Sequence, residues 1–112
     1  MSKKYSKQSP QIIEMQEIFN NLDVKFRYVR THSRFSSVGN DDLLERYRHD
    51  ISHIHYALQT LTPEQSYIIT QTFHFDGTFS NTWWKGIFSK STFYRKRREA
   101  IDIFLMEYHQ SC

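Results

Sequence analysis

Cysteine, glycine and proline are scarce in this chain, and each scarcity excludes a class of protein. The single cysteine, Cys112, cannot form a disulfide within the chain or a cysteine-based zinc site. Three glycines and two prolines among 112 residues argue against a turn-rich β fold and against a disordered chain rich in these residues. Because 38% of the residues are hydrophobic, we expect one domain with its own core, with or without a short arm.

Long apolar runs are also missing. No stretch approaches the roughly 18 apolar residues that a transmembrane helix needs, so we expect no membrane span. The first seven residues include three lysines but are not followed by an apolar segment, which argues against a secretory signal. We therefore expect a cytoplasmic protein.

Positive charge is concentrated in the two outer parts of the chain. Residues 1–39 carry seven Lys or Arg against three acids, residues 40–75 carry two against five, and residues 76–112 carry six against four. Six cations and no acid lie between Lys85 and Arg98. Although the formal net charge is only +3, this uneven distribution is typical of a protein with one face for a polyanion.

The amino-terminal part is predicted to contain one helix, a basic arm and a loop. Ser9 is a suitable N-cap and Pro10 a suitable first residue for a helix that ends near Asn21. Residues 23–31 fit either a continued helix or an irregular arm, and residues 32–40 are predicted to form a loop. We therefore separate residues 1–39 from a helical domain over residues 40–112.

The clearest helix spans Asp41–Leu61. Its apolar residues are separated by 3, 4, 3, 4 and 3 positions, which makes a seam of three heptads: Leu44, Tyr47, Ile51, Ile54, Leu58 and Leu61. The favoured interpretation is an amphipathic helix packed inside its own domain. The second interpretation is a homodimer formed through Leu44, Tyr47, Ile51, Ile54 and Leu58, since three heptads are the threshold for a coiled coil.

Residues 62–109 are predicted to form three helices with short connections. Thr62 caps the first, with Gln65 completing a capping box, and Asp76-Gly77 ends it. A short helix runs from Ser80 through Ile87, and the last helix starts at Ser89 or Ser91 and reaches about His109. A short helix followed by a helix with a basic start is the order of a helix-turn-helix motif. The whole chain is therefore expected to be all-α, with about five helices.

Four short motifs resemble region four of bacterial sigma factors. They are Leu61-Thr62-Pro63-Glu64-Gln65, Phe75-Asp76-Gly77, Ser89-Lys90-Ser91-Thr92-Phe93 and Arg97-Arg98-Glu99-Ala100-Ile101. The run Ser91–Arg95 is still more similar to phage transcriptional regulators of the ArpU class. The resemblance covers about residues 58–105. It departs from the family pattern where Lys96 or Arg97 occupies a position that is usually apolar, although the aliphatic stem can still cover a core.

The resemblance implies a sequence-specific, double-stranded-DNA-binding transcriptional regulator, with RNA polymerase as a candidate partner. By position, the first three residues of the last helix would meet phosphates, the next group would read base edges, and two cations would bind the flanking backbone. These DNA-binding candidates are Lys90, Ser91 and Thr92; Tyr94, Arg95 and Arg98; and Lys96 and Arg97. The alternative is a protein–protein interaction module that docks RNA polymerase or another partner without binding duplex DNA.

Metal, cofactor and enzyme hypotheses find little support in the sequence. His49 and His53 have the spacing of a helical metal pair, but no third ligand has a clear spacing to them. Both lie away from the apolar seam and are expected to be surface histidines. No nucleophile with a base and no glycine-rich phosphate loop is recognisable, so we expect neither an enzyme nor a metal or cofactor site.

Overall fold

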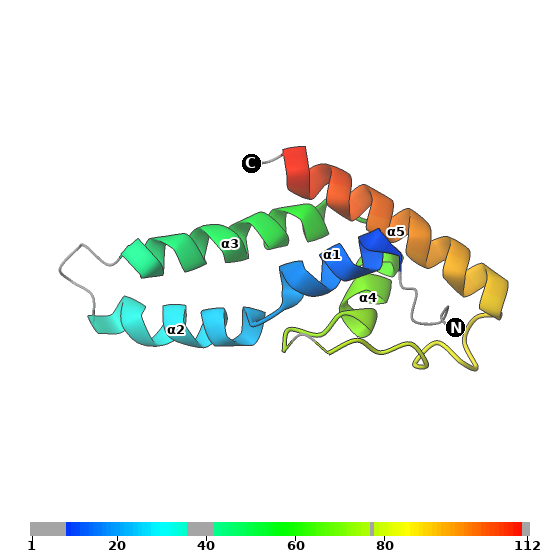
Figure 1. The fold of residues 1–112 in the computed structure, drawn as a ribbon, viewed down its shortest axis with the longest axis horizontal. Helices are drawn as coiled ribbons and strands as arrows, with labels where there is room; N and C mark the ends of the chain where they lie inside the picture. Colours follow the sequence, from blue (N-terminus) through cyan, green and yellow to red (C-terminus); the bar gives the residue numbers. More distant parts are fainter. Residues whose placement is uncertain (1–8, 36–41, 77, 111–112) are drawn as a thin grey trace.

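The computed structural model of the protein describes residues 9–35, 42–76 and 78–110, and within them it is all-α (Figure 1). No strand forms among these residues; Phe73 and Phe79 make an isolated antiparallel β bridge. The expected all-α class is thereby confirmed. The helices are α1 (Pro10–Phe19), α2 (Leu22–Phe35), α3 (Asp42–Gln59), α4 (Pro63–Thr72) and α5 (Lys90–Gln110).

Helices α2 and α3 form a hairpin, and the main core lies where α1, α4 and α5 meet the end of α3. Helices α2 and α3 lie side by side, and α5 packs against both α3 and α4 (Figure 1). Helix α1 contributes Ile12, Met15 and Phe19 to the main core, where they meet Ile101 and Phe104 of α5. None of the helices in the described part of the chain is long and apolar enough to cross a membrane.

Residues 22–35 are helical, which resolves the ambiguity over residues 23–31 and corrects the predicted loop. The Ser9 hydroxyl accepts a hydrogen bond from the Ile12 backbone N–H at 3.2 Å and caps α1 as expected. Asn21 then adopts a positive φ of 61°, a conformation that asparagine tolerates better than most residues. The chain turns there and restarts as α2, which continues through residues 32–35. The rest of the predicted loop, residues 36–40, lies outside the described residues.

The heptad seam of α3 is packed within the chain. Ile54 and Leu61 are buried in the main core, and Ile51 and Leu58 pack against it. At the other end of the helix Leu44 is buried, and the Tyr47 ring contacts the Tyr28 ring of α2 with a centroid distance of 5.2 Å. These contacts account for the apolar spacing of the helix through burial inside one molecule, the interpretation that the sequence favoured.

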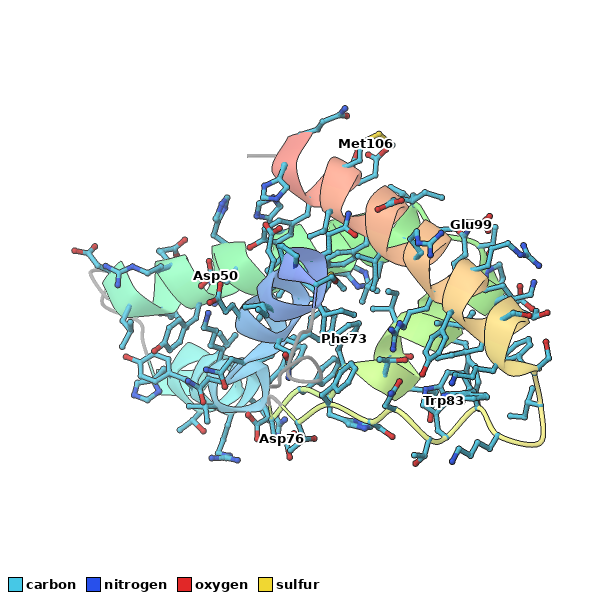
Figure 2. All side chains as sticks on the ribbon, turned by 45° about the vertical axis from the view of Figure 1, so that its right-hand side comes forward. Asp50, Phe73, Asp76, Trp83, Glu99 and Met106 are labelled. Atoms are coloured by element: carbon cyan, nitrogen blue, oxygen red, sulfur yellow. The ribbon has the colours of Figure 1, made fainter. Side chains whose placement is uncertain are left out.

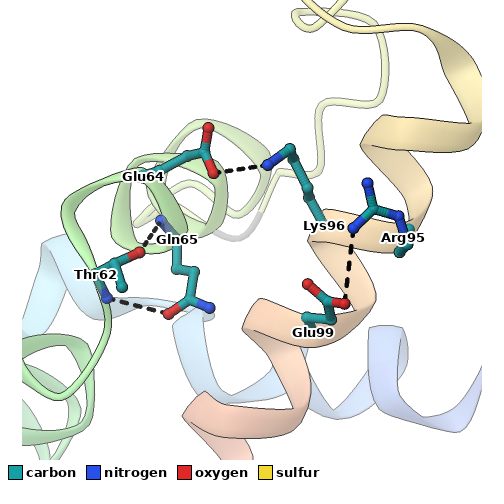
Figure 3. Close-up of polar contacts among 6 residues, drawn as sticks. All are labelled: Thr62, Glu64, Gln65, Arg95, Lys96 and Glu99. Atoms are coloured by element: carbon teal, nitrogen blue, oxygen red, sulfur yellow. Dashed lines mark hydrogen bonds and ion pairs between the residues drawn. The ribbon is translucent and has the colours of Figure 1, made fainter.

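Helix α4 has the predicted start but an earlier end. The Thr62 hydroxyl accepts from the Gln65 backbone N–H and the Gln65 side chain accepts from the Thr62 backbone N–H, both at 3.1 Å, so the capping box is confirmed (Figure 3). The helix ends at Thr72 because Phe73 is extended and bridges to Phe79.

The sequence predicted that Asp76 would end α4. In the structure Asp76 lies in a turn beyond the end of this helix. Its carboxylate accepts from the backbone N–H of Thr78 at 2.9 Å and from the Thr78 hydroxyl at 2.7 Å. These bonds, the backbone bond first, lower the pKa of Asp76 below its ordinary value. Gly77, the other residue of the predicted stop, lies outside the described residues.

The predicted short helix from Ser80 through Ile87 is absent, because residues 81–88 form bends and turns. Backbone N–H groups of Ile87 and Phe88 both donate to the Trp84 carbonyl, at 2.9 and 3.1 Å. Gly86 has a positive φ of 88°, which interrupts helical geometry at little steric cost because glycine has no Cβ. We name residues 79–88 the turn segment.

Candidate nucleic-acid interface

The start of α5 rests on a small aromatic cluster that is separate from the main core. The cluster contains Ile68, Trp84 and Phe93, with Trp83, Phe88 and Tyr94 packed against it. The Phe93 ring stacks on Trp84 with a centroid distance of 4.9 Å and an interplanar angle of 12°. Ile87 of the turn segment does not join this cluster, because 60% of the residue is exposed.

Both indole N–H groups of this cluster are satisfied. Trp83 donates to the Thr72 hydroxyl of α4 at 3.0 Å, and Trp84 donates to the Asn81 carbonyl at 2.8 Å. These bonds fix the turn segment between α4 and α5, since a buried indole without an acceptor would be costly. The start of α5 is therefore held from below by apolar rings and by hydrogen bonds of defined direction.

The first turn of α5 presents polar side chains to the surface. The Ser89 hydroxyl accepts from the Thr92 backbone N–H at 3.3 Å, so Ser89, rather than Ser91, is the N-cap of α5. Lys90 and Ser91 are exposed and Thr92 is half-buried. Unpaired backbone N–H groups at a helix start favour anions, and the neighbouring lysine adds a full positive charge.

Arg95 and Arg98 lie on the outward face of α5. Arg98 is exposed and forms no ion pair with any residue that the structure describes. Arg95 forms an ion pair with Glu99 at 3.8 Å, and both side chains are more than half exposed (Figure 3). An exposed pair one helical turn apart contributes only about 0.3–0.5 kcal/mol, so Arg95 can exchange Glu99 for another anion at small cost.

Two other side chains that the sequence predicted to contact DNA, Lys96 and Tyr94, contact other parts of the protein. Lys96 forms an ion pair with Glu64, in the first turn of α4, at 3.0 Å, and its side chain is 28% exposed (Figure 3). Tyr94, predicted on the outward face, is half-buried, and its ring packs on Trp84 with a centroid distance of 5.9 Å. Both side chains thus connect α5 to neighbouring elements.

Arg97, like Lys96, is a half-buried cation of residues 90–98, which we name the basic segment. Its guanidinium donates to the Asn81 side-chain oxygen at 2.9 Å and lies 4.9 Å from the Tyr94 ring centroid and 5.5 Å from that of Phe93. Burial lowers the pKa of Arg97 from its ordinary value because the charged form loses solvation. The predicted contact of Arg97 with flanking phosphates is therefore not supported by its position.

The outward face of α5 changes sign along the helix. Ser91, Arg95, Arg98 and Asp102 follow one another at intervals of four, three and four residues, which places them on one side of a helix. Asp102 accepts a hydrogen bond from the Gln11 side chain of α1 at 2.7 Å. Cations are thus confined to the first three turns, and acids follow.

The start of α1 lies beside this basic segment. An open cavity of about 330 Å³ separates them and is lined by Ser9, Gln11, Ile12, Tyr94, Arg97, Arg98 and Ile101. Helix α1 therefore flanks α5 on the side of Arg98, while Arg95 lies outside the lining of this cavity. Figure 2, with Glu99 labelled, shows side chains of this part of α5 projecting from the ribbon.

The histidine pair of α3 is split between surface and interior. His49 is exposed, as expected, whereas His53 is buried, which corrects the prediction. The His53 ring stacks on Tyr108 of α5 with a centroid distance of 4.1 Å, and its Nε2 hydrogen-bonds with the Tyr108 carbonyl oxygen. No group of three His, Cys, Asp or Glu in the described part of the chain is arranged to hold a metal ion.

The sequence did not predict the residues that bind Lys96 and Arg97 within the protein. Glu64 and Asn81 are 32 and 16 residues away from the cations that they bind, and no local pattern marks either as a partner. A weak signal was available in the sigma-type motif, which usually has an apolar residue where this chain has Lys96 or Arg97.

Comparison with known proteins assigns no family to the chain. No family model, curated protein or solved structure matches it. The resemblance to sigma region four therefore stays a prediction from the sequence motifs. The geometry around α5 provides the independent basis for a proposed function.

Proposed function

We propose that this protein is a sequence-specific DNA-binding transcriptional regulator that contacts duplex DNA through the first three turns of α5. One observation carries the proposal. Lys90, Ser91, Arg95 and Arg98 are exposed on one end of a helix whose opposite side, at Phe93, is completely buried. A rigidly supported, cationic helix start is the kind of element that enters a major groove.

The exposed side chains divide into two roles. Lys90 and Ser91, at the helix start, are suited to phosphate oxygens, which set the position of the protein on DNA. Arg95 and Arg98 carry planar guanidinium groups that can bind the O6 and N7 atoms of guanine together, with roughly 1–3 kcal/mol of discrimination for each such contact. This set has four of the eight residues predicted from sequence. Tyr94, Lys96 and Arg97 are engaged inside the protein, and Thr92 is half-buried.

The connection between α4 and α5 departs from the predicted helix-turn-helix, because the short first helix of that motif is absent. The two helices pack against each other, and the turn segment crosses between them in place of the short helix. The proposed interface would therefore keep the reading helix, α5, with α4 as its support, but without the short first helix of a sigma-region-four-like motif. RNA polymerase remains the candidate partner that the motif resemblance implies.

The test is a titration of labelled duplex DNA at several salt concentrations. Wild-type affinity should fall steeply with salt, because each neutralised phosphate adds about 0.9 to the slope of log affinity against log salt. Arg95→Ala/Arg98→Ala should weaken binding at least about tenfold, since each base contact is worth roughly 1–3 kcal/mol. The control is Arg46→Ala/Arg48→Ala, which removes two exposed arginines of α3 and should leave affinity within about threefold.

The alternative is a protein-interaction module, and the acids on α5 favour it. Glu99 is exposed on the same side of the helix as Arg95, and a carboxylate so placed repels phosphates. Weak binding that does not depend on salt and is equal in wild type and in both double variants would contradict DNA binding. Titration of purified RNA polymerase with the same proteins would then test the alternative.

A further inference from the structure

We propose that Arg97 is the residue that positions α5 for DNA binding, by fastening the turn segment to the helix, and that it does not contact DNA. The inference rests on the proposed function and assigns a different role to one cation of the basic segment. Lys90, Arg95 and Arg98 would bind the DNA. Arg97 would fix the orientation of α5 and therefore the direction in which these side chains point.

The contacts of Arg97 come from both sides of the connection. On α5 the guanidinium lies against the rings of Phe93 and Tyr94, and in the turn segment it lies 5.9 Å from the Phe79 ring centroid and donates to Asn81 at 2.9 Å. Each cation–aromatic contact is favourable because the ring face is electronegative. One side chain thus joins the beginning of the turn segment to the second turn of α5.

The turn segment depends on side-chain contacts with α5 because it lacks regular secondary structure of its own. In the predicted motif, a short helix would satisfy its own backbone and present an apolar side to the last helix. Here residues 81–88 form bends and turns, and Ile87 points into solvent with 60% of its surface exposed. Apart from the aromatic contacts of the turn segment with Phe93 and Tyr94, the hydrogen bond from Arg97 to Asn81 attaches the segment to α5.

Asn81 also connects this fastener to the indole pair. Its backbone carbonyl accepts from the Trp84 indole N–H at 2.8 Å, while its side chain accepts from Arg97. Displacement of Asn81 would therefore change the environment of Trp84. Since Trp83 and Trp84 are the two tryptophans of the chain, tryptophan fluorescence and near-ultraviolet circular dichroism report on this connection directly.

The experiment compares Arg97→Met and Asn81→Ala with Lys90→Ala, which removes an exposed cation at the start of α5. Methionine keeps an apolar stem over the rings but removes the charge and the hydrogen bond, so the variant retains the packing needed to fold. Arg97→Met should lower duplex affinity by about tenfold, because it removes the charged hydrogen bond that orients α5. The slope of log affinity against log salt should stay at the wild-type value, because no phosphate contact is lost. Lys90→Ala should instead lower the slope by about 0.9, because Lys90 is assigned to a phosphate contact.

Two further readouts separate positioning from general destabilisation. Arg97→Met and Asn81→Ala should each change the tryptophan signals while far-ultraviolet circular dichroism stays at the wild-type value. The double variant should bind DNA no more weakly than Arg97→Met alone, because both changes break one contact.

The outcomes decide between the roles. A salt slope that falls by about 0.9 in Arg97→Met would show that Arg97 contacts a phosphate, and an unchanged affinity and unchanged tryptophan signals would show that it positions nothing; either result overturns the inference. If the wild-type protein itself does not bind duplex DNA, the proposed function fails. The tryptophan signals of the free protein then still decide whether Arg97 fastens the turn segment.

Discussion

Replacement of Phe93 by alanine tests whether the start of α5 depends on its own small core. Phe93 is completely buried and belongs to the aromatic cluster rather than to the main core. Its ring contacts Trp83, Trp84 and Phe88 at centroid distances of 5.4, 4.9 and 6.2 Å. Phe93→Ala therefore removes the one side chain of α5 that all three of these rings share.

The expected loss is large relative to the stability of the protein. Truncation of a buried phenylalanine costs about 3–5 kcal/mol, and each aromatic pair that disappears contributes about 0.5–1.5 kcal/mol within that cost. At roughly 0.05–0.15 kcal/mol per residue, a chain of this length has a total unfolding free energy of about 6–17 kcal/mol. The cluster is small, so we expect it to open before the main core does.

The assay is urea unfolding followed by two signals. Tryptophan fluorescence reports the aromatic cluster, which holds both indoles, and far-ultraviolet circular dichroism reports all the helices. In Phe93→Ala the fluorescence midpoint should fall further than the circular dichroism midpoint. The control is Phe104→Ala, which truncates an equally buried ring of α5 in the main core and should move both transitions together.

Two results would refute this reasoning. A loss below about 1 kcal/mol in Phe93→Ala would mean that the ring is not packed as described, since truncation of a buried phenylalanine costs about 3–5 kcal/mol. Coincident fluorescence and circular dichroism transitions in Phe93→Ala would mean that the cluster and the main core unfold as one cooperative unit.

Two smaller perturbations test local features, in addition to the DNA-binding variants described above. Thr62→Ala should lower the unfolding free energy by about 1 kcal/mol, because it removes the capping-box acceptor of α4, whereas Thr62→Ser should retain nearly all of it; equal urea midpoints for wild type and Thr62→Ala would contradict the capping role. Asp76→Asn keeps a side-chain acceptor for Thr78 but removes the charge. Because the pKa of Asp76 is lowered in the folded state, its carboxylate stabilises the fold above about pH 4 and loses this effect as the pH falls through the folded pKa. The melting temperature of wild type should therefore exceed that of Asp76→Asn at pH 6 and approach it near pH 2, and a gap that grows on acidification would contradict the interpretation.

Local sequence signals determined the helix starts. Ser9 and Thr62 cap α1 and α4 as predicted, and Ser89 caps α5, because a hydroxyl at an N-cap needs only a backbone N–H two or three residues away. The apolar spacing of α3 likewise predicted the burial of Leu44 and Ile54, although not that of His53. These features depend on residues that are close in sequence, so a single chain suffices to recognise them.

The end of α4 and the turn segment were decided by tertiary contacts. Phe73 leaves the helix to bridge Phe79, and the tryptophans that were expected on a short helix are held instead by Thr72 and Asn81. Propensity alone favoured a helical stop at Asp76, but the burial of aromatic rings against α5 outweighs a few helical hydrogen bonds. His53 is similar, since its burial depends on Tyr108 from the far end of the chain.

By itself, the sequence determined that this is a helical protein with a dense group of cations at the start of its last helix. Only the tertiary structure decided which of those cations are available to a ligand. Lys96 and Arg97 are held by Glu64 and Asn81, whereas Arg98 extends from the surface. The physical reason is that charge is a property of a residue, but its solvation and its partners are set by segments that folding brings together from distant parts of the chain.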